Sequence, residues 1–253
     1  MPKAIIDGKE CTFEKGELLL QVAKRNGIEI PTLCHHEALP GLAACRLCIC
    51  EVVERGMRKV VASCVYPLEM DCEVYTQSEK IRRERATILM LLKMRAPESE
   101  RIDQLYREYG AVPTGRFKIH DGDKCILCGL CVKACNELGA GAIATINRGV
   151  TKEISTPYGE PNPVCIGCLS CAHICPTQAI AFEEHKESRT VWGKKFRVLS
   201  CRMCGAPIGT EEEMTYAADR AEEEDREFAH LCPSCRQKKA AKVFAEAFGI
   251  PPM

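Results

Sequence analysis

Nineteen cysteines in a chain of 253 residues constrain this protein more than any other feature of its sequence. They fall into three blocks, because residues 73–124 and 176–200 contain none. A chain of this length can bury a core without disulfide bonds, and its first residues, Met1–Gly8, lack the apolar stretch of a secretory signal. Clustered cysteines without such a signal are expected to bind metal in a reducing compartment. The sequence therefore predicts a cytoplasmic, metal-binding protein.

The middle block repeats one spacing, C-x2-C-x2-C-x3-C, at residues 125–135 and again at residues 165–175. This spacing resembles the paired run of bacterial-type ferredoxins that hold two 4Fe–4S clusters. In that arrangement three closely spaced thiolates and the fourth cysteine of the other motif hold each cluster, so the chain crosses over between its halves. The expected ligand sets are Cys125, Cys128, Cys131 and Cys175 for the first cluster, and Cys165, Cys168, Cys171 and Cys135 for the second.

Two details of the middle block bear on this interpretation. The second motif is followed by Pro176, as in the ferredoxin pattern, whereas Asn136 follows the first. Two zinc knuckles would use the same residue type, but eight cysteines at a doubled spacing favour clusters. Gly129 and Gly167 lie inside the loops, where we expect the backbone to approach the sulfur atoms closely.

The first block has the spacing C-x10-C-x2-C-x15-C, which is not that of plant-type ferredoxins. The stretch 33–52 resembles the N-terminal 2Fe–2S domain of the large iron–sulfur subunit of complex I and of NAD-linked hydrogenases. The resemblance implies a 2Fe–2S cluster, with a cysteine-rich zinc site as the alternative. His35 and His36 raise the possibility of Rieske-type ligation, but four thiolates already complete a cluster, so we expect both imidazoles outside the ligand set. The implied ligands are Cys34, Cys45, Cys48 and Cys64.

The local pattern around the first block agrees with a β-grasp fold. Asp7-Gly8 predicts a hairpin turn between two short strands. Residues 17–25 carry apolar side chains at helical spacing, and residues 48–53 and 60–63 alternate as strands do.

Two connecting helices are predicted after this domain. Ser78 is a suitable N-cap for a helix that runs to about Arg95, and a second helix is expected from Glu98 to Tyr109. In the resembled subunits this linker usually carries a His-x3-Cys-x2-Cys-x5-Cys motif for another 4Fe–4S cluster. Residues 93–99 contain neither Cys nor His, so we expect that cluster to be absent.

The third block consists of two C-x2-C pairs separated by a long insert, which predicts one tetrahedral site with four sulfur ligands. We favour structural zinc, with rubredoxin-like iron as the alternative and a third 4Fe–4S cluster as the lesser one. The acidic stretches 211–213 and 222–225 oppose binding of nucleic acid, as does a formal net charge of zero. The expected metal ligands are Cys201, Cys204, Cys232 and Cys235.

The remaining motifs do not predict a cofactor or metal site. Cys11, Cys50 and Cys72 are expected to be small buried apolar residues. Residues 139–144 match G-x-G-x-x-A, but a dinucleotide site needs a preceding strand and a following helix, so we predict a turn. Residues 238–248 are expected to form an amphipathic helix packed on the core or on a partner. No apolar run is long enough to predict a membrane span.

Together these patterns predict an α+β protein. Its four expected parts are a β-grasp 2Fe–2S ferredoxin-type domain (1–77), a helical linker (78–112), a two-4Fe–4S ferredoxin module (113–188), and a zinc-ribbon or rubredoxin-like extension that binds metal through four cysteines (189–253). The expected cofactors are one 2Fe–2S cluster, two 4Fe–4S clusters and one zinc ion, or iron in its place.

Residues 1–185 resemble the small diaphorase subunit of NAD(P)-linked hydrogenases, and the extension is similar to tails of formate-hydrogenlyase-type subunits. The resemblance implies a non-catalytic electron relay between a flavin-containing NAD(P)H-binding subunit and a hydrogenase catalytic subunit. The same relay could serve a formate dehydrogenase or a transhydrogenase, with ferredoxin as a further donor or acceptor. An iron–sulfur redox sensor is the alternative of another class, although no basic effector domain is evident.

Overall fold

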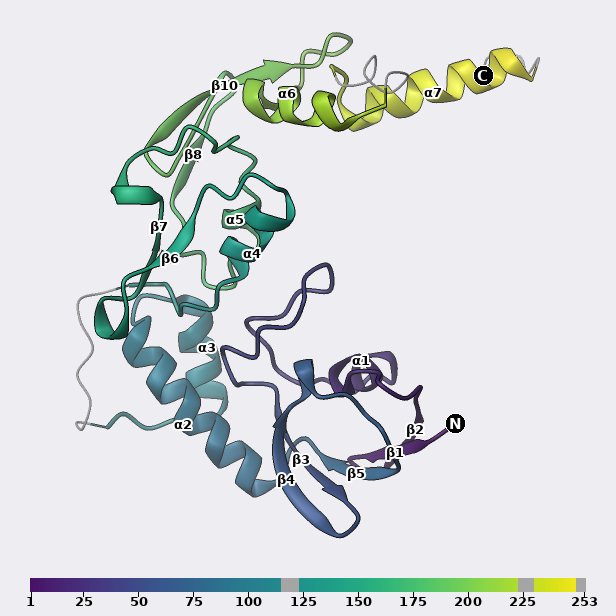
Figure 1. Cartoon of the computed structure of the whole chain (residues 1–253), viewed down its shortest axis with the longest axis vertical. Coiled ribbons are helices and arrows are strands. Elements are labelled where there is room, and N and C mark those ends of the chain that lie inside the picture. The colour runs from purple at the N-terminus through teal and green to yellow at the C-terminus, as the bar shows by residue number, and fades with distance from the viewer. Residues whose placement is uncertain (115–122, 223–229, 249–253) are drawn as a thin grey trace. The chain divides into compact units, whose positions relative to one another are not determined.

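The computed structural model describes residues 1–114, 123–222 and 230–248 (Figure 1). The chain divides into two compact units, each of which contains helices and strands. The division into four parts stays a prediction. The first unit comprises residues 1–134, 145–154 and 171–179, and the second comprises residues 135–144, 155–170 and 180–253.

A five-stranded sheet forms the base of the first unit, with the strand order β2-β1-β5-β3-β4 (Figure 1). The β1–β5 pair is parallel and the other pairs are antiparallel. Helix α1 (Leu19–Arg25) packs its apolar side chains against this sheet, as a β-grasp fold requires. The strands are β1 (Lys3–Ile6), β2 (Lys9–Thr12), β3 (Ile49–Glu54), β4 (Met57–Ala62) and β5 (Cys72–Tyr75).

The predicted hairpin turn is present between β1 and β2. Asp7 and Gly8 both have positive φ, 47° and 84°, as the two central residues of a type I′ turn require. The side chain of Asp7 also accepts a hydrogen bond of 2.8 Å from the backbone N of Thr76, which follows β5. This hydrogen bond joins the turn between β1 and β2 to the segment that connects β5 to the next helix.

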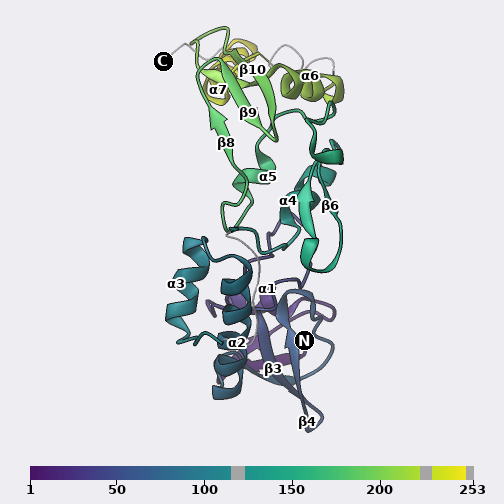
Figure 2. The same cartoon turned by 90° about the vertical axis from the view of Figure 1, so that its left-hand side faces the viewer.

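Helices α2 (Glu79–Arg95) and α3 (Glu100–Glu108) lie side by side after the sheet (Figures 1 and 2). Ser78 caps α2 as predicted, because its side chain accepts a hydrogen bond from the backbone N of Ile81. The second helix begins two residues later than predicted, because Ser99 caps it in the same way. Both helices contribute to a buried core that also contains residues of the cysteine loops.

Short elements surround the middle block of cysteines. Helix α4 (Leu130–Glu137) begins inside the first motif and α5 (Ser170–His173) inside the second. Strands β6 (Ala144–Ile146) and β7 (Glu153–Ser155) form a two-stranded sheet, so a strand, not a helix, follows the glycine-rich residues 139–144. Single 3-10 turns occupy Ser63–Val65, Gly149–Thr151 and Pro157–Gly159.

The second unit contains an antiparallel sheet with the order β11-β10-β9-β8 (Figure 2). Helix α6 (Glu211–Arg220) follows the sheet directly and begins with a capping box between Thr210 and Glu213. The acidic residues 223–225 lie outside the described residues. The strands are β8 (Phe182–Glu184), β9 (Ser188–Val191), β10 (Lys194–Ser200) and β11 (Pro207–Thr210).

Helix α7 (Pro233–Ala247) begins five residues earlier than the tail helix predicted from the sequence. Proline suits the first turn of a helix, since its missing N–H would have no partner there. Val243, Phe244 and Phe248 are exposed, so these apolar side chains are not packed on the described core. Among the described helices, none has both the length and the apolarity needed to cross a bilayer.

Candidate iron–sulfur and metal centres

The four cysteines of the first block lie together in the first unit, and all four are buried. They form two pairs. The backbone N of Cys45 donates a hydrogen bond of 3.3 Å to Cys34 Sγ, and Cys48 Sγ lies 3.3 Å from Cys64 Sγ. Two pairs of thiols are the ligand arrangement that two neighbouring iron ions need.

The electrostatics of these thiols follow from the pairing. A hydrogen bond from Cys34 lowers the pKa of the Cys45 thiol to about 6, and a hydrogen bond from Cys64 lowers that of Cys48 to about 6. The same bonds, together with burial, raise the pKa of Cys34 and Cys64. Each pair thus holds one proton tightly, and binding of cations would release it because metal ligands must be deprotonated.

The loop that carries these thiols has an unusual backbone. Ala43 and Arg46 have positive φ, 50° and 61°, a left-handed conformation that costs a non-glycine residue about 1–2 kcal/mol. A Cβ atom on Gly41 would lie 2.8 Å from the carbonyl oxygen of Cys64, so only glycine fits there. The loop shape is therefore fixed around the sulfur atoms at some conformational cost.

Two buried polar atoms next to this site have no hydrogen-bond partner among the described residues: Ser63 Oγ and Arg85 Nη1. Ser63 precedes Cys64, and Arg85 donates to the carbonyl oxygens of Leu47 and Ile49, the two neighbours of Cys48. Orphaned buried donors are rare and call for an acceptor. A sulfur-rich, negatively charged group fits this donor set.

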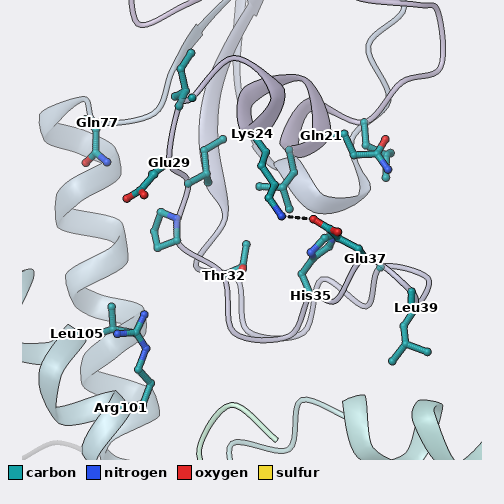
Figure 3. A pocket seen from close by; sticks show the side chains of 18 of the residues that line it. Gln21, Lys24, Glu29, Thr32, His35, Glu37, Leu39, Gln77, Arg101 and Leu105 are labelled. Atoms are coloured by element: carbon teal, nitrogen blue, oxygen red, sulfur yellow. Dashed lines mark hydrogen bonds and ion pairs between the residues drawn. The ribbon is translucent and has the colours of Figure 1, made fainter. Parts of the chain in front are cut away.

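The two histidines after Cys34 are engaged elsewhere. His35 lines a pocket of about 960 Å³ whose walls come from α1, residues 27–41 and α3, and it lies next to the Lys24–Glu37 ion pair (Figure 3). Burial lowers the pKa of His35. His36 Nδ1 accepts a hydrogen bond of 3.2 Å from the backbone N of Ala38. Neither contact involves the four thiols.

The two motifs of the middle block adopt the same backbone shape. The residues two and four positions after the first cysteine have positive φ in both motifs: Leu127 (53°) and Gly129 (78°), Gly167 (71°) and Leu169 (58°). The backbone N of Leu127 donates a hydrogen bond of 3.4 Å to Cys125 Sγ. Such loops turn backbone N–H groups toward the sulfur atom, which stabilises a thiolate.

The backbone of Gly167 approaches sulfur as expected: burial raises the pKa of the Cys165 thiol, and a hydrogen bond from Gly167 acts in the opposite direction. A Cβ on Gly129 would make only an ordinary contact of 3.7 Å with Leu42. A Cβ on Gly167 would lie 2.9 Å from the ring of Phe196 on β10, so a side chain does not fit at this position. Gly167 is needed because a strand packs on the loop.

The fourth cysteine of each motif approaches the other motif. Burial raises the pKa of Cys125, of Cys128 (to about 11) and of Cys131 (to about 12), and the charge of Cys175 adds to each of these shifts. Burial likewise raises the pKa of Cys165, and Cys135 adds to that shift. These neighbours are the ones that the crossover predicts, although the ligand sets themselves stay a prediction.

One buried core joins the first block to the first motif of the middle block. Cys34 and Cys45 share this core with Cys128, and the charge of Cys45 contributes to the raised pKa of Cys128, after burial itself. Lys133 Nζ donates a hydrogen bond of 3.0 Å to the carbonyl oxygen of Pro40 in the first loop. Thiols of two predicted clusters therefore lie close together. The core also contains Leu47, Leu89, Ile102, Leu105, Ile126 and Leu130.

The third block forms a separate centre in the second unit. Its four sulfur atoms all lie within 4.8 Å of one another, and Cys204 Sγ is 3.6 Å from Cys232 Sγ. A tetrahedron with metal–sulfur bonds of about 2.3 Å has edges of about 3.8 Å. A hydrogen bond from the backbone N of Cys232 lowers the pKa of Cys201 to about 6. This arrangement fits a single metal ion with four thiolate ligands.

The three remaining cysteines belong to none of these sets. Cys11, Cys50 and Cys72 are buried on strands of the first sheet, and burial raises the pKa of each thiol, to about 12 for Cys50 and about 11 for Cys72. Such thiols stay protonated and pack as small apolar groups.

The sequence analysis did not predict that Arg85 is buried next to the site of the first block, although the sequence contains a signal for it. Ile81, Arg85 and Leu89 recur at a spacing of four residues on the buried face of α2, and all three are buried. A charged residue inside an apolar helical stripe indicates a buried partner. The left-handed Ala43 and Arg46 had no comparable signal in the sequence.

Residues 3–79 match the family described as "2Fe-2S iron-sulfur cluster binding domain". The N-terminal part of the chain is therefore similar to a 2Fe–2S domain. The match covers the five strands, α1 and all four cysteines of the first block.

The comparisons beyond the 2Fe–2S domain confirm the resemblance stated from the sequence. The chain is 32% identical over 229 residues to "NADPH-Fe(3+) oxidoreductase subunit alpha" of Geobacter sulfurreducens, covering 81% of this chain and 27% of the relative. It is 32% identical to "NADP-reducing hydrogenase subunit HndD" of Solidesulfovibrio fructosivorans, covering 71% and 36%. It is 28% identical to the mitochondrial "NADH-ubiquinone oxidoreductase 78 kDa subunit" of Candida albicans, covering 75% and 30%. The chain thus spans about a third or less of the length of these relatives.

A solved structure of an NAD+-reducing NiFe-hydrogenase contains a chain with a similar fold. The TM-score is 0.60 at 22% identity, and the match covers 89% of this chain and 98% of that chain. At this identity the likeness concerns the fold.

Proposed function

We propose that this chain is a non-catalytic electron-relay subunit of an NAD(P)-linked oxidoreductase, most specifically a hydrogenase. The observation that carries the proposal is the shared buried core of Cys34, Cys45 and Cys128. A relay needs redox centres that are close together, shielded from water and held in a fixed geometry. A core that joins thiols of two cluster sites supplies all three conditions.

In this proposal each cysteine set holds one iron–sulfur cluster, and the bound clusters supply one-electron redox chemistry. The chain's own residues hold the clusters, exclude water and direct N–H groups toward sulfur. Cys34 with Cys45, and Cys48 with Cys64, would each bind one iron of the 2Fe–2S cluster. The 4Fe–4S sets are Cys125, Cys128, Cys131 and Cys175, and Cys135, Cys165, Cys168 and Cys171.

We assign one zinc ion to Cys201, Cys204, Cys232 and Cys235. The sulfur spacing supports one metal ion rather than a larger cluster. Four thiolate ligands close the site, so its role is to hold β11 and α7 together rather than to bind a substrate. Iron in the same site is the alternative.

The proposed partners are a flavin-containing NAD(P)H-binding subunit and a hydrogenase catalytic subunit in the cytoplasm. The names of the relatives support this choice, since they describe subunits of NADPH-, NADP- and NADH-linked oxidoreductases. No contact among the described residues favours formate dehydrogenase, transhydrogenase or a redox sensor over a hydrogenase relay.

The test is anaerobic purification of the native complex, followed by assays of NAD(P)+ reduction with hydrogen and, separately, with formate. Hydrogen-dependent reduction is the expected result. Formate-dependent reduction alone would keep the relay and replace the terminal enzyme. A chain that purifies without partners, with intact clusters and with neither activity, would overturn the relay in favour of a sensor.

A further inference from the structure

Arg85 is a buried cation without a matching anion among the described residues. Its side chain lies on α2 and is 0% exposed. Its Nε and Nη2 atoms donate hydrogen bonds of 2.9 Å and 2.8 Å to the carbonyl oxygens of Leu47 and Ile49. Nη1 has no partner, and no described carboxylate forms an ion pair with the guanidinium.

This burial needs compensation. A guanidinium keeps its proton in proteins, and a charge taken out of water without a counter-charge is strongly destabilising. The ring of Tyr109, whose centroid is 5.9 Å from the guanidinium carbon, offers only a weak attraction. The proposed 2Fe–2S cluster on Cys48 would supply negative charge beside the guanidinium, since Arg85 binds the carbonyl oxygens on both sides of that cysteine.

The two hydrogen bonds of Arg85 also have a positional effect. They join the carbonyls on both sides of Cys48 to a helix that lies outside the cluster loop. Helix α2 is itself fixed to β3, since the side chain of its cap, Ser78, donates a hydrogen bond to the buried carboxylate of Glu51. The cation is therefore held beside the loop by contacts at two points along the helix.

We propose that Arg85 is a positioning residue that fixes the loop around Cys48 and raises the reduction potential of the 2Fe–2S cluster. Reduction adds one electron to a centre that is already negative, and a fixed buried cation stabilises the added charge. The inference rests on the proposed 2Fe–2S site.

The test is a redox titration of the anaerobically purified complex, monitored by the electron paramagnetic resonance (EPR) signal of the reduced 2Fe–2S cluster. Arg85→Met removes the charge and the donors, Arg85→Gln removes the charge and keeps an N–H donor, and Arg85→Lys keeps the charge and loses the paired donors. Arg83→Met, an exposed arginine of the same helix, is the matched control. We compare the variants at the potential at which half of the parent's 2Fe–2S clusters are reduced. At that potential we expect the ratio of reduced to oxidised cluster to be about tenfold lower in both neutral variants. For one electron this corresponds to a midpoint potential lower by about 59 mV.

The Arg83→Met midpoint should match that of the parent. Arg85→Lys should keep a midpoint near that of the parent while its EPR g-values shift, because the loop carbonyls lose one donor. A parent-like midpoint in either neutral variant overturns the electrostatic role. If neither neutral variant retains a cluster, unchanged g-values in Arg85→Lys overturn the positional role. A parent without any 2Fe–2S signal would instead refute the proposed function.

Discussion

At the scale of the residue, the cysteines show that one type of side chain has different roles in different surroundings. Cys45 and Cys48 each share a hydrogen bond with a second thiol, which lowers their pKa to about 6. Cys50 lies two residues from Cys48 on the same strand, and burial raises its pKa to about 12. The difference is the main influence on each thiol: a hydrogen bond with a second thiol in the first case, burial in the second. Position in the fold, and not residue type, selects the ligands.

We predict that Cys45→Ser removes the 2Fe–2S cluster, while Cys11→Ser retains it. Cys45 pairs with Cys34, whereas Cys11 is an equally buried thiol on β2 outside every proposed ligand set. The expected loss of EPR signal is at least about tenfold, since even outer hydrogen-bond partners of a metal ligand contribute about 10–100-fold. Equal cluster content in the two variants, measured by EPR and iron analysis, would contradict the ligand assignment.

Gly167→Ala should destabilise the second unit more than Gly159→Ala. Both glycines have φ of 71°, but only the new methyl at position 167 would approach the Phe196 ring, at 2.9 Å. The left-handed backbone costs about 1–2 kcal/mol for alanine, and overpacking adds about 1–3 kcal/mol. Chemical denaturation of the two variants measures the difference. Equal losses would mean that the ring moves aside freely.

At the scale of the element, local signals predicted some parts of the fold and failed for others. The Asp7-Gly8 turn and the Ser78 cap of α2 depend on residues within a few positions of each other, so the sequence alone revealed them. The start of α7 was missed although Pro233 is itself a local signal for the first turn of a helix. Arg85 and the left-handed Arg46 were missed because their conformations depend on contacts with other elements and on loop shape.

The crossover of the middle block gives a prediction at this scale. Cys175→Ser should damage the cluster of the first motif, because Cys175 lies close enough to Cys125, Cys128 and Cys131 to raise the pKa of each. The cluster of Cys165, Cys168 and Cys171 should persist. EPR spectra of the reduced protein distinguish the two signals, with Cys72→Ser as the buried control. Loss of the second cluster alone would show that the motifs do not exchange their fourth cysteines.

At the scale of the whole molecule, the chemistry is distributed over two compact units. The first contains the four cysteines of the first block and those predicted for the first 4Fe–4S cluster, and Cys34, Cys45 and Cys128 share one buried core. The second contains the four-cysteine site of the third block, with its own small core that includes Leu231 and Ile208. Perturbations of distant sites that share no partners generally add independently. Metal loss at the four-cysteine site is therefore expected to leave the 2Fe–2S domain unchanged.

We accordingly predict that Cys204→Ser lowers zinc content and destabilises the second unit without changing the 2Fe–2S EPR signal. Cys204 is one of the four sulfur ligands and the exposed one among them, so its loss opens the site to water. Elemental analysis for zinc and iron, with limited proteolysis to follow α7, measures both effects. A fall in the 2Fe–2S signal that parallels the loss of zinc would show that the two units are coupled.

The burial of the four thiols of the 2Fe–2S domain has a consequence for how the protein is made. Each of these thiols is at most 4% exposed, so a carrier that delivers iron and sulfide cannot reach them once the domain has closed. Cluster insertion therefore has to occur before or during closure of this core, while the chain is newly synthesised. The exposed Cys204, in contrast, leaves its site open to metal exchange in the finished protein. The two sites of this one chain are therefore expected to differ in when their metal can be loaded relative to folding.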